Sequence, residues 1–121
     1  MLSLDVKPIG VVRLAHDGRA VLEVHPAYLD GLQGLGPGDR VQVLYWMHEL
    51  GHGERRLLRL HPGGHEGQPK RGVFALRSCI RPNPIGVSEA EVVEVREAAL
   101  VVVGLDARDG SPLLDVKAAC P

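Results

Sequence analysis

The sequence predicts an all-β protein, a small single-domain β-barrel over residues 1–121 with seven or eight short, mostly antiparallel strands. Fifteen glycines and nine prolines are spread through the chain, and both residue types interrupt regular elements and mark turns. The runs between them are short and rich in Val, Leu and Ile. Turn signals recur about every 8 to 12 residues, the spacing typical of sandwiches and barrels, so we expect almost no helix.

Strands are predicted where apolar runs lie between turn signals. In chain order they cover residues 9–14, 20–24, 40–47, 57–60, 72–76, 87–95, 99–105 and 113–117. The first two flank Asp17-Gly18, and Asp-Gly is a strong signal for a hairpin turn. Pro26 can open one short helical turn, because a proline costs little at a helix start. The third strand ends in Tyr45-Trp46, which predicts burial on both faces there.

Polar or glycine-rich connections separate the remaining strands. The segments 48–56 and 61–71 carry glycines and many charged residues, so we expect exposed loops there. A turn near Arg96 joins two valine-rich strands, and the segment 106–112 forms a tight turn before the last strand. We find no internal repeat, linker or low-complexity segment, and we therefore expect one domain.

Charge and composition narrow the classes of function. Fourteen basic and fifteen acidic residues give a net charge of −1, which excludes a strongly basic nucleic-acid binder but allows a local basic patch. No apolar run approaches the roughly 20 residues that span a bilayer. No charged-then-apolar leader opens the chain, so we expect a cytoplasmic protein without membrane attachment. Cys79 and Cys120 form no disulfide framework and are expected to be free thiols.

Aromatic residues are scarce. They are Tyr28, Tyr45, Trp46 and Phe74. Proteins that bind single strands by stacking use several aromatic side chains in succession. We therefore do not expect an aromatic stacking platform for bases.

The segment 77–86 (RSCIRPNPIG) carries the most chemical information. Each proline disfavours the α conformation in the residue before it, so Arg81 and Asn83 should be extended. Such a stiff loop, with free carbonyls and an amide, suits recognition of a flat heterocycle such as adenine. Arg77 and Arg81 can hold a carboxylate or phosphate, and Gly86 permits close backbone approach. The alternative is a rigid connection between two strands with solvated arginines.

Two histidine pairs with a spacing of four residues raise a metal site as a further hypothesis. They are His48 with His52 and His61 with His65. That spacing places two ligands on one face of a helix. Glycines within both segments argue against a helix, however, and we expect loop histidines and no bound metal.

Two charged segments also have two interpretations each. Asp106 at a strand end can place a carboxylate beside a ligand, or it can simply precede the Asp109-Gly110 turn. Basic residues are concentrated in the middle of the chain, and they are Arg55, Arg56, Arg59, Lys70 and Arg71. They can form a phosphate-binding face or an ordinary solvated surface.

The stretch 71–88 (RGVFALRSCIRPNPIGVS) resembles the signature of the TrmO/TsaA-like family, which runs RGVFATRS, two variable residues and RPNPIG-hydrophobic-S. Three further segments agree in order. Residues 9–13 are similar to the family's opening strand, and residues 43–48 to its central strand ending in histidine. Residues 104–117 resemble its closing LDxxDGTPxLDIK stretch. The resemblance covers nearly the whole chain.

The resemblance implies a homodimeric β-barrel enzyme that uses S-adenosylmethionine to methylate tRNA. The methyl group goes to N6 of the threonylcarbamoyl-adenosine beside the anticodon. The residues that correspond to the family's adenosylmethionine site are His48, Glu49, Arg77, Val87, Val103, Gly104, Leu105 and Asp106. The candidate substrate-binding residues, which include one basic face, are Arg81, Arg55, Arg56, Arg59 and Lys70.

This chemistry is a single displacement at a sulfonium methyl group and needs no metal. Its main demand is alignment of the reacting atoms at about 3 to 3.5 Å. The attacking nitrogen also loses a proton, so a positioned acceptor is expected. His48, Glu49 and Asp106 are the candidates for it, and Asn83 is expected to orient the substrate because an amide does not titrate.

One departure from the family bears on the cofactor. Family members usually carry an insertion after the first strand, with a Pro-Arg-Gln motif that contributes to the cofactor site. Here residues 14–18 lead directly into the second strand. A second hypothesis is therefore a shortened, non-catalytic relative that binds an adenosyl-containing ligand or a protein partner.

Overall fold

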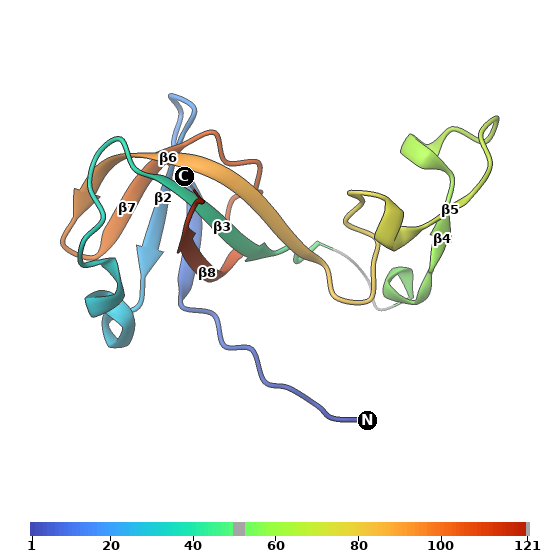
Figure 1. Cartoon of the computed structure of the whole chain (residues 1–121), viewed down its shortest axis with the longest axis horizontal. Coiled ribbons are helices and arrows are strands. Elements are labelled where there is room, and N and C mark those ends of the chain that lie inside the picture. Colours follow the sequence, from blue (N-terminus) through green and yellow to red (C-terminus); the bar gives the residue numbers. More distant parts are fainter. Residues whose placement is uncertain (50–52, 121) are drawn as a thin grey trace. The chain divides into compact units, whose positions relative to one another are not determined.

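The computed structural model describes residues 1–49 and 53–120 (Figure 1). The chain divides into two compact units. The barrel unit comprises Met1–Trp46 and Gly86–Pro121, and the insert unit comprises Met47–Ile85. None of the described helices has the length and apolar character needed to cross a membrane.

Six strands form a closed barrel in the order β1-β2-β7-β6-β3-β8. Their bounds are β1 Gly10–Leu14, β2 Arg19–Val24, β3 Arg40–Trp46, β6 Ile85–Arg96, β7 Ala99–Val103 and β8 Pro112–Ala118. Neighbours β1–β2, β1–β8, β2–β7, β3–β8 and β6–β7 pair antiparallel. The predicted all-β barrel is therefore confirmed.

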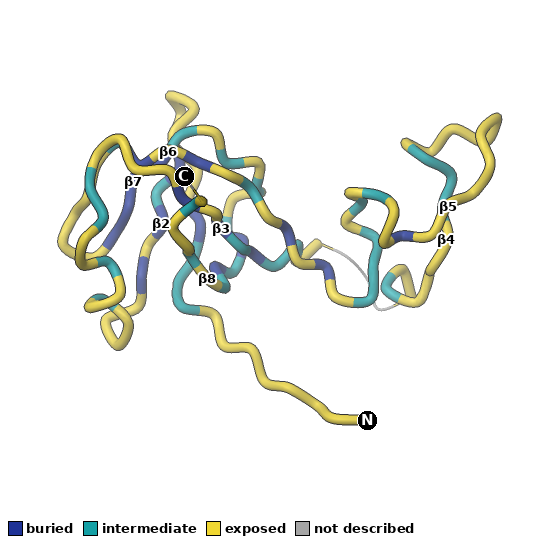
Figure 2. Tube along the Cα trace, in the orientation of Figure 1, coloured by how far each residue is buried: buried dark blue, intermediate teal, exposed yellow. Residues whose placement is uncertain are grey.

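Buried residues alternate with more exposed ones along β2 and β3 (Figure 2), whereas β7 is buried along most of its length. In β3, Val43 and Tyr45 are buried and Gln42 is exposed. Successive side chains of a strand point to opposite faces, so the buried set fills the inside of the closed sheet. The outward positions Leu44 and Trp46 are only half-buried, which is less than the burial predicted for both faces.

Local chemistry closes the first hairpin as predicted. The amide of Ala15 donates to the carbonyl of Arg19 at 2.9 Å, and the Asp17 carboxylate accepts from the Arg19 amide at 3.1 Å. Gly18 has a φ of 82°, a conformation that glycine adopts without steric cost. The predicted helical turn is also present, as the 3-10 helix η1 (Pro26–Leu32).

The insert unit contains a two-stranded antiparallel sheet of β4 (Arg59–Leu60) and β5 (Arg71–Gly72). Three single 3-10 turns accompany it, η2 (Glu54–Arg56), η3 (Pro62–Gly64) and η4 (Val73–Ala75). The strand predicted over 72–76 was wrong beyond its start. The Leu76 amide donates to the Val73 carbonyl at 3.2 Å, and this bond curls the chain into η4. Cys79 and Cys120 are exposed free thiols, as predicted.

Candidate functional site

The predicted site residues fall into two groups, one on each unit. The group on the barrel unit consists of Val87, Val103, Gly104, Leu105 and Asp106. The group on the insert unit consists of His48, Glu49, Asn83, Arg77, Arg81, Arg55, Arg56, Arg59 and Lys70. Two elements position the barrel group. Val87 lies on β6, and residues 103–106 form the end of β7 and the segment that follows it.

A hydrogen-bonded triangle fixes the barrel group. The hydroxyl of Tyr45, on β3, donates to the backbone carbonyl of Asp106. It also lies 3.0 Å from the hydroxyl of Ser88 on β6, which must then be the donor of that pair. Ser88 Oγ accepts in turn from the Asp106 amide at 3.4 Å. Both backbone polar groups of Asp106 are thereby held by side chains from two neighbouring strands, while its carboxylate stays exposed.

Gly86 makes room for the ring that carries this hydroxyl. A Cβ at position 86 would lie 2.3 to 2.9 Å from three ring atoms of Tyr45, far inside van der Waals contact. Gly86 is itself buried. Sequence reasoning expected Gly86 to admit a ligand, whereas the structure shows it admitting a buried tyrosine ring. Neither Tyr45 nor Ser88 was identified from the sequence, although Ser88 lies within the motif.

Arg81 braces the proline-rich loop of the insert unit. Its Nη1 donates to the carbonyls of Leu76 at 3.2 Å and Ser78 at 2.8 Å. The amide of Ile80 donates to Ser78 Oγ at 3.0 Å and tightens the same turn. Arg81 is half-buried, so one edge of its guanidinium serves the loop itself.

Other carbonyls of this loop are also engaged. Arg55 Nε donates to the Pro82 carbonyl at 3.0 Å. The carbonyl of Asn83 accepts from the Ile85 amide, and that of Pro84 from the Met47 amide, each at 2.7 Å. The loop is stiff, as its prolines predict, but it offers fewer free carbonyls than the sequence implied.

A pocket of about 620 Å³ opens beside the exposed Arg77. Its lining residues are Leu60, His61, Gly63, Gly64, Glu66, Leu76, Arg77, Ser78 and Ile80. Apolar walls with one guanidinium, one carboxylate, one imidazole and one hydroxyl are the composition of many small-molecule sites. His48 and Glu49 are exposed just after β3.

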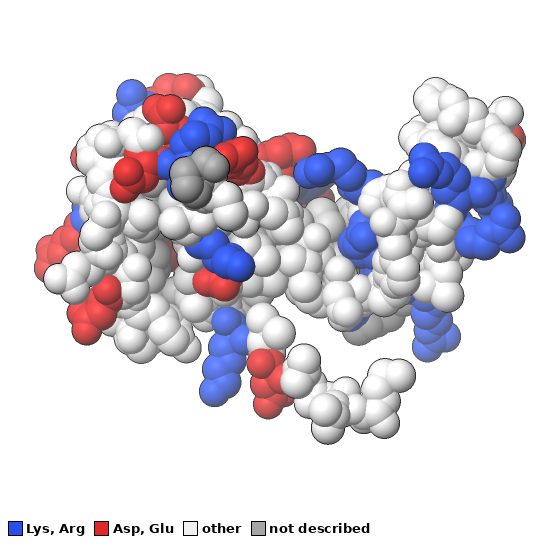
Figure 3. All heavy atoms as spheres, in the orientation of Figure 1, with Lys and Arg blue, Asp and Glu red and all other residues white. Residues whose placement is uncertain are grey.

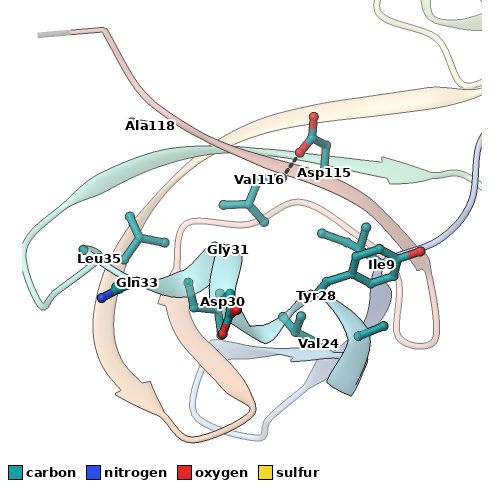
Figure 4. A pocket seen from close by; sticks show the side chains of 13 residues that line it. Ile9, Val24, Tyr28, Asp30, Gly31, Gln33, Leu35, Asp115, Val116 and Ala118 are labelled. Carbon is teal, nitrogen blue, oxygen red and sulfur yellow. Dashed lines mark hydrogen bonds between the residues drawn. The ribbon is translucent and has the colours of Figure 1, made fainter.

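A second pocket, of about 590 Å³, lies on the barrel between η1 and β8 (Figure 4). Val116 points toward η1, whereas the carboxylate of the preceding Asp115 points the opposite way. Tyr28, Ile9 and Leu35 add further apolar surface. Asp30 and Gln33 also line this pocket, and it contains none of the predicted site residues.

The histidine hypothesis gains no support from the geometry. Across residues 1–49 and 53–120, no three His, Cys, Asp or Glu side chains gather as potential metal ligands. His61 Nδ1 lies 2.8 Å from the carbonyl of Gln68 and belongs to a loop. His52 lies outside the described residues.

Charge is distributed unequally between the two units. Seven of the fourteen Lys and Arg residues, but only three of the fifteen Asp and Glu residues, lie within 47–85. The insert unit thus has a formal charge of +4 and the remainder of the chain −5, and Figure 3 shows Lys and Arg gathered on the insert unit. Whole-chain net charge hides this separation, which a count by segment reveals.

Four arginines of the barrel unit are paired with carboxylates. The ion pairs of this unit are Arg13–Glu23, Arg19–Asp17, Arg40–Glu89 and Arg96–Glu94. The hydrogen bond from Arg40 to Glu89, at 3.1 Å, raises the pKa of Arg40. Such exposed pairs contribute little to stability, but they reduce the positive potential that the barrel presents.

Residues 7–121 match the family model described as the tRNA-methyltransferase O N-terminal domain. A probable S-adenosyl-L-methionine-binding protein of Methanocaldococcus jannaschii is 37% identical over 113 residues, which cover 93% of this chain and 89% of the relative. A relative of the same description from Methanothermobacter thermautotrophicus is 38% identical over 129 residues, covering 96% and 90%.

A solved structure is also similar. The crystal structure of TrmO from Pseudomonas aeruginosa matches with a TM-score of 0.75 and 28% identity, covering 99% of this chain. The chain spans 57% of that solved protein.

Proposed function

Since this chain belongs to the tRNA-methyltransferase O N-terminal domain family, we propose that it is an S-adenosylmethionine-dependent methyltransferase acting on N6 of threonylcarbamoyl-adenosine in tRNA. The observation that carries the proposal is the triangle of Tyr45, Ser88 and Asp106. It immobilises the backbone at the end of β7, which the family resemblance assigns to the cofactor. Relatives described as binding S-adenosyl-L-methionine support the same cofactor.

The donor set of this chain fits that cofactor. Adenosylmethionine supplies, when bound, an activated methyl group on a sulfonium that is displaced in one step. The family resemblance also assigns Arg77 to this cofactor, and its side chain is exposed. The exposed carboxylate of Asp106 can pair with the ammonium of the cofactor. The backbone held by Tyr45 offers fixed groups to the adenosyl part, so the binding residues need little reorganisation.

The remaining chemistry concerns one proton. Transfer of the cofactor's methyl group to the substrate nitrogen would require that nitrogen to lose its proton. His48, Glu49 and Asp106 are the candidate acceptors, and Asn83 is the candidate that orients the substrate. His48, Glu49 and Asn83 are exposed, as such a role requires.

The insert unit is the proposed tRNA-binding part. Its formal charge of +4 attracts RNA phosphates locally, although the whole chain has a net charge of −1. Arg55, Arg56, Arg59 and Lys70 are the proposed phosphate contacts. A homodimer, which the family resemblance implies, would join two such basic units.

Two measurements test the proposal in order. Calorimetric titration of the chain with adenosylmethionine should give saturable heat, and no heat at millimolar cofactor would refute it. Labelled methyl transfer should then occur to tRNA that carries threonylcarbamoyl-adenosine, and not to the same tRNA without the modification. Methyl transfer to both RNAs would refute the proposed substrate but would still support methyltransferase activity.

The direct connection of β1 to β2 favours a second candidate. Residues 15–18 form a tight hairpin where the family usually has the segment with a Pro-Arg-Gln motif. A chain that binds adenosylmethionine but transfers no methyl group under any RNA condition would be the non-catalytic relative.

A further inference from the structure

We propose that Phe74 is the stacking site for one unpaired RNA base, and that the cations of the β4–β5 sheet hold the adjoining phosphates. The inference rests on the proposed function for the identity of the RNA as tRNA. Phe74 is 81% exposed, more than any other large apolar side chain described after Leu4. Its sequence neighbour Val73 is 1% exposed.

The backbone holds Phe74 in a defined position. The Val73 amide donates to the Leu58 carbonyl at 2.9 Å, which ties η4 to the residue just before β4. The Leu76 amide donates to the Val73 carbonyl and closes the turn around Phe74. With Val73 buried and both flanks bonded, the aromatic ring is presented to solvent by a fixed turn. An exposed ring on a fixed turn can stack on a base at little entropic cost.

The two-stranded sheet that leads into η4 carries two cations. Arg59 pairs in register with Gly72, and Leu60 pairs with Arg71, two and three residues before Phe74. Arg59 and Arg71 are exposed. In the part of the chain that the structure describes, neither forms an ion pair, in contrast to the paired cations of the barrel.

An exposed aromatic ring on a segment that also carries exposed arginines matches single-stranded RNA. Bases in unpaired loops stack on aromatic side chains while Lys and Arg contact the phosphates. Protein interfaces are also enriched in aromatic residues and arginine, but the formal charge of +4 on residues 47–85 favours a polyanionic partner. Because aromatic residues are scarce, the sequence predicted no platform that stacks several bases. Stacking of a single base requires only one exposed ring.

The test uses the full chain and a fluorescein-labelled RNA hairpin with an unpaired loop. Phe74→Ala should weaken binding about ten-fold and leave the slope of log K against log salt unchanged, because stacking releases no counterions. Phe74→Trp should restore the affinity. Arg59→Ala should instead lower that slope by about 1. Tyr28→Ala is the matched control, since Tyr28 is an exposed aromatic residue on the barrel, and it should bind RNA normally.

Two outcomes would overturn the inference. The first is unchanged RNA affinity in Phe74→Ala. The second is a change of sedimentation behaviour in that variant, which would show that Leu57, Leu58 and Phe74, all exposed here, pack against a second copy. Calorimetric titration with adenosylmethionine distinguishes a failure of the Phe74 inference from a failure of the proposed function. If the chain binds RNA through Phe74 but does not bind adenosylmethionine, this inference is supported and the proposed methyltransferase activity is refuted.

Discussion

The hydroxyl of Tyr45 donates a hydrogen bond to the backbone carbonyl of Asp106, a residue 61 positions away in sequence. Ser88 completes the contact from β6, so β3, β6 and the segment after β7 meet at one hydroxyl. Tyr45 therefore acts as a positioning residue for the proposed cofactor segment, without having to touch the cofactor.

Tyr45→Phe removes this hydroxyl and keeps the ring. We expect adenosylmethionine affinity to fall about ten-fold and the free energy of unfolding to fall by about 1 to 2 kcal/mol, because two buried hydrogen bonds are lost. Calorimetry and urea unfolding measure the two effects. Tyr28→Phe is the control, because Tyr28 is exposed. Normal affinity in Tyr45→Phe would show that the triangle only stabilises the fold.

Gly86→Ala tests the space beneath the ring. The added Cβ would overlap three atoms of Tyr45, and overpacking of this kind costs about 1 to 3 kcal/mol. Gly31→Ala is a matched control, because nothing lies within 4 Å of its added Cβ, and we expect a change of less than about 0.5 kcal/mol. Equal urea midpoints for both variants would contradict the close packing of Gly86.

Arg81→Lys keeps the charge and loses the planar guanidinium. A lysine cannot reproduce a guanidinium's fixed donor geometry toward two carbonyls, so the turn over 76–80 should loosen. We expect faster amide hydrogen exchange at Ile80 and weaker adenosylmethionine binding. Arg71→Lys, on β5, should change neither. Exchange that stays slow in Arg81→Lys would mean that the prolines alone hold the loop.

Chelation tests the chemistry of transfer. Displacement at a sulfonium methyl group needs no Lewis acid, so excess EDTA should leave the rate of methyl transfer unchanged. His61→Ala combined with His65→Ala should leave it unchanged as well. A rate that EDTA abolishes and zinc restores would revive the metal hypothesis.

The strands of the barrel were predictable, because their signals are local. Asp17-Gly18 marked the first hairpin, and seven of the eight predicted runs overlap strands of the structure over two or more residues, whereas the run 72–76 overlaps β5 only at Gly72. The strand predicted over 72–76 was wrong beyond Gly72, because hydrogen bonding and burial in the tertiary structure determine the conformation there. Val73 is anchored by Leu58 and buried, and the chain then turns instead of extending.

The candidate site was predictable only as a set of residues. The motif around Pro82 and Pro84 predicted a stiff loop, since proline restricts its own backbone and that of its neighbour. It did not show that Arg81 and Arg55 would occupy the loop's carbonyls, because each such bond depends on how the chain folds back on itself.

The sequence by itself determined an all-β chain, a stiff proline-rich loop and a basic middle segment, because turn residues, alternation and charge are properties of neighbouring residues. Only the tertiary structure decided which side chains serve one another. Closure of the barrel brings Tyr45, Ser88 and Asp106 together across strands that are distant in sequence. Phe74, on the turn that follows the small β4–β5 sheet, is left in solvent close in sequence to the exposed Arg71. Hydrogen bonds and burial are set by distances in space, and residue order alone does not contain them.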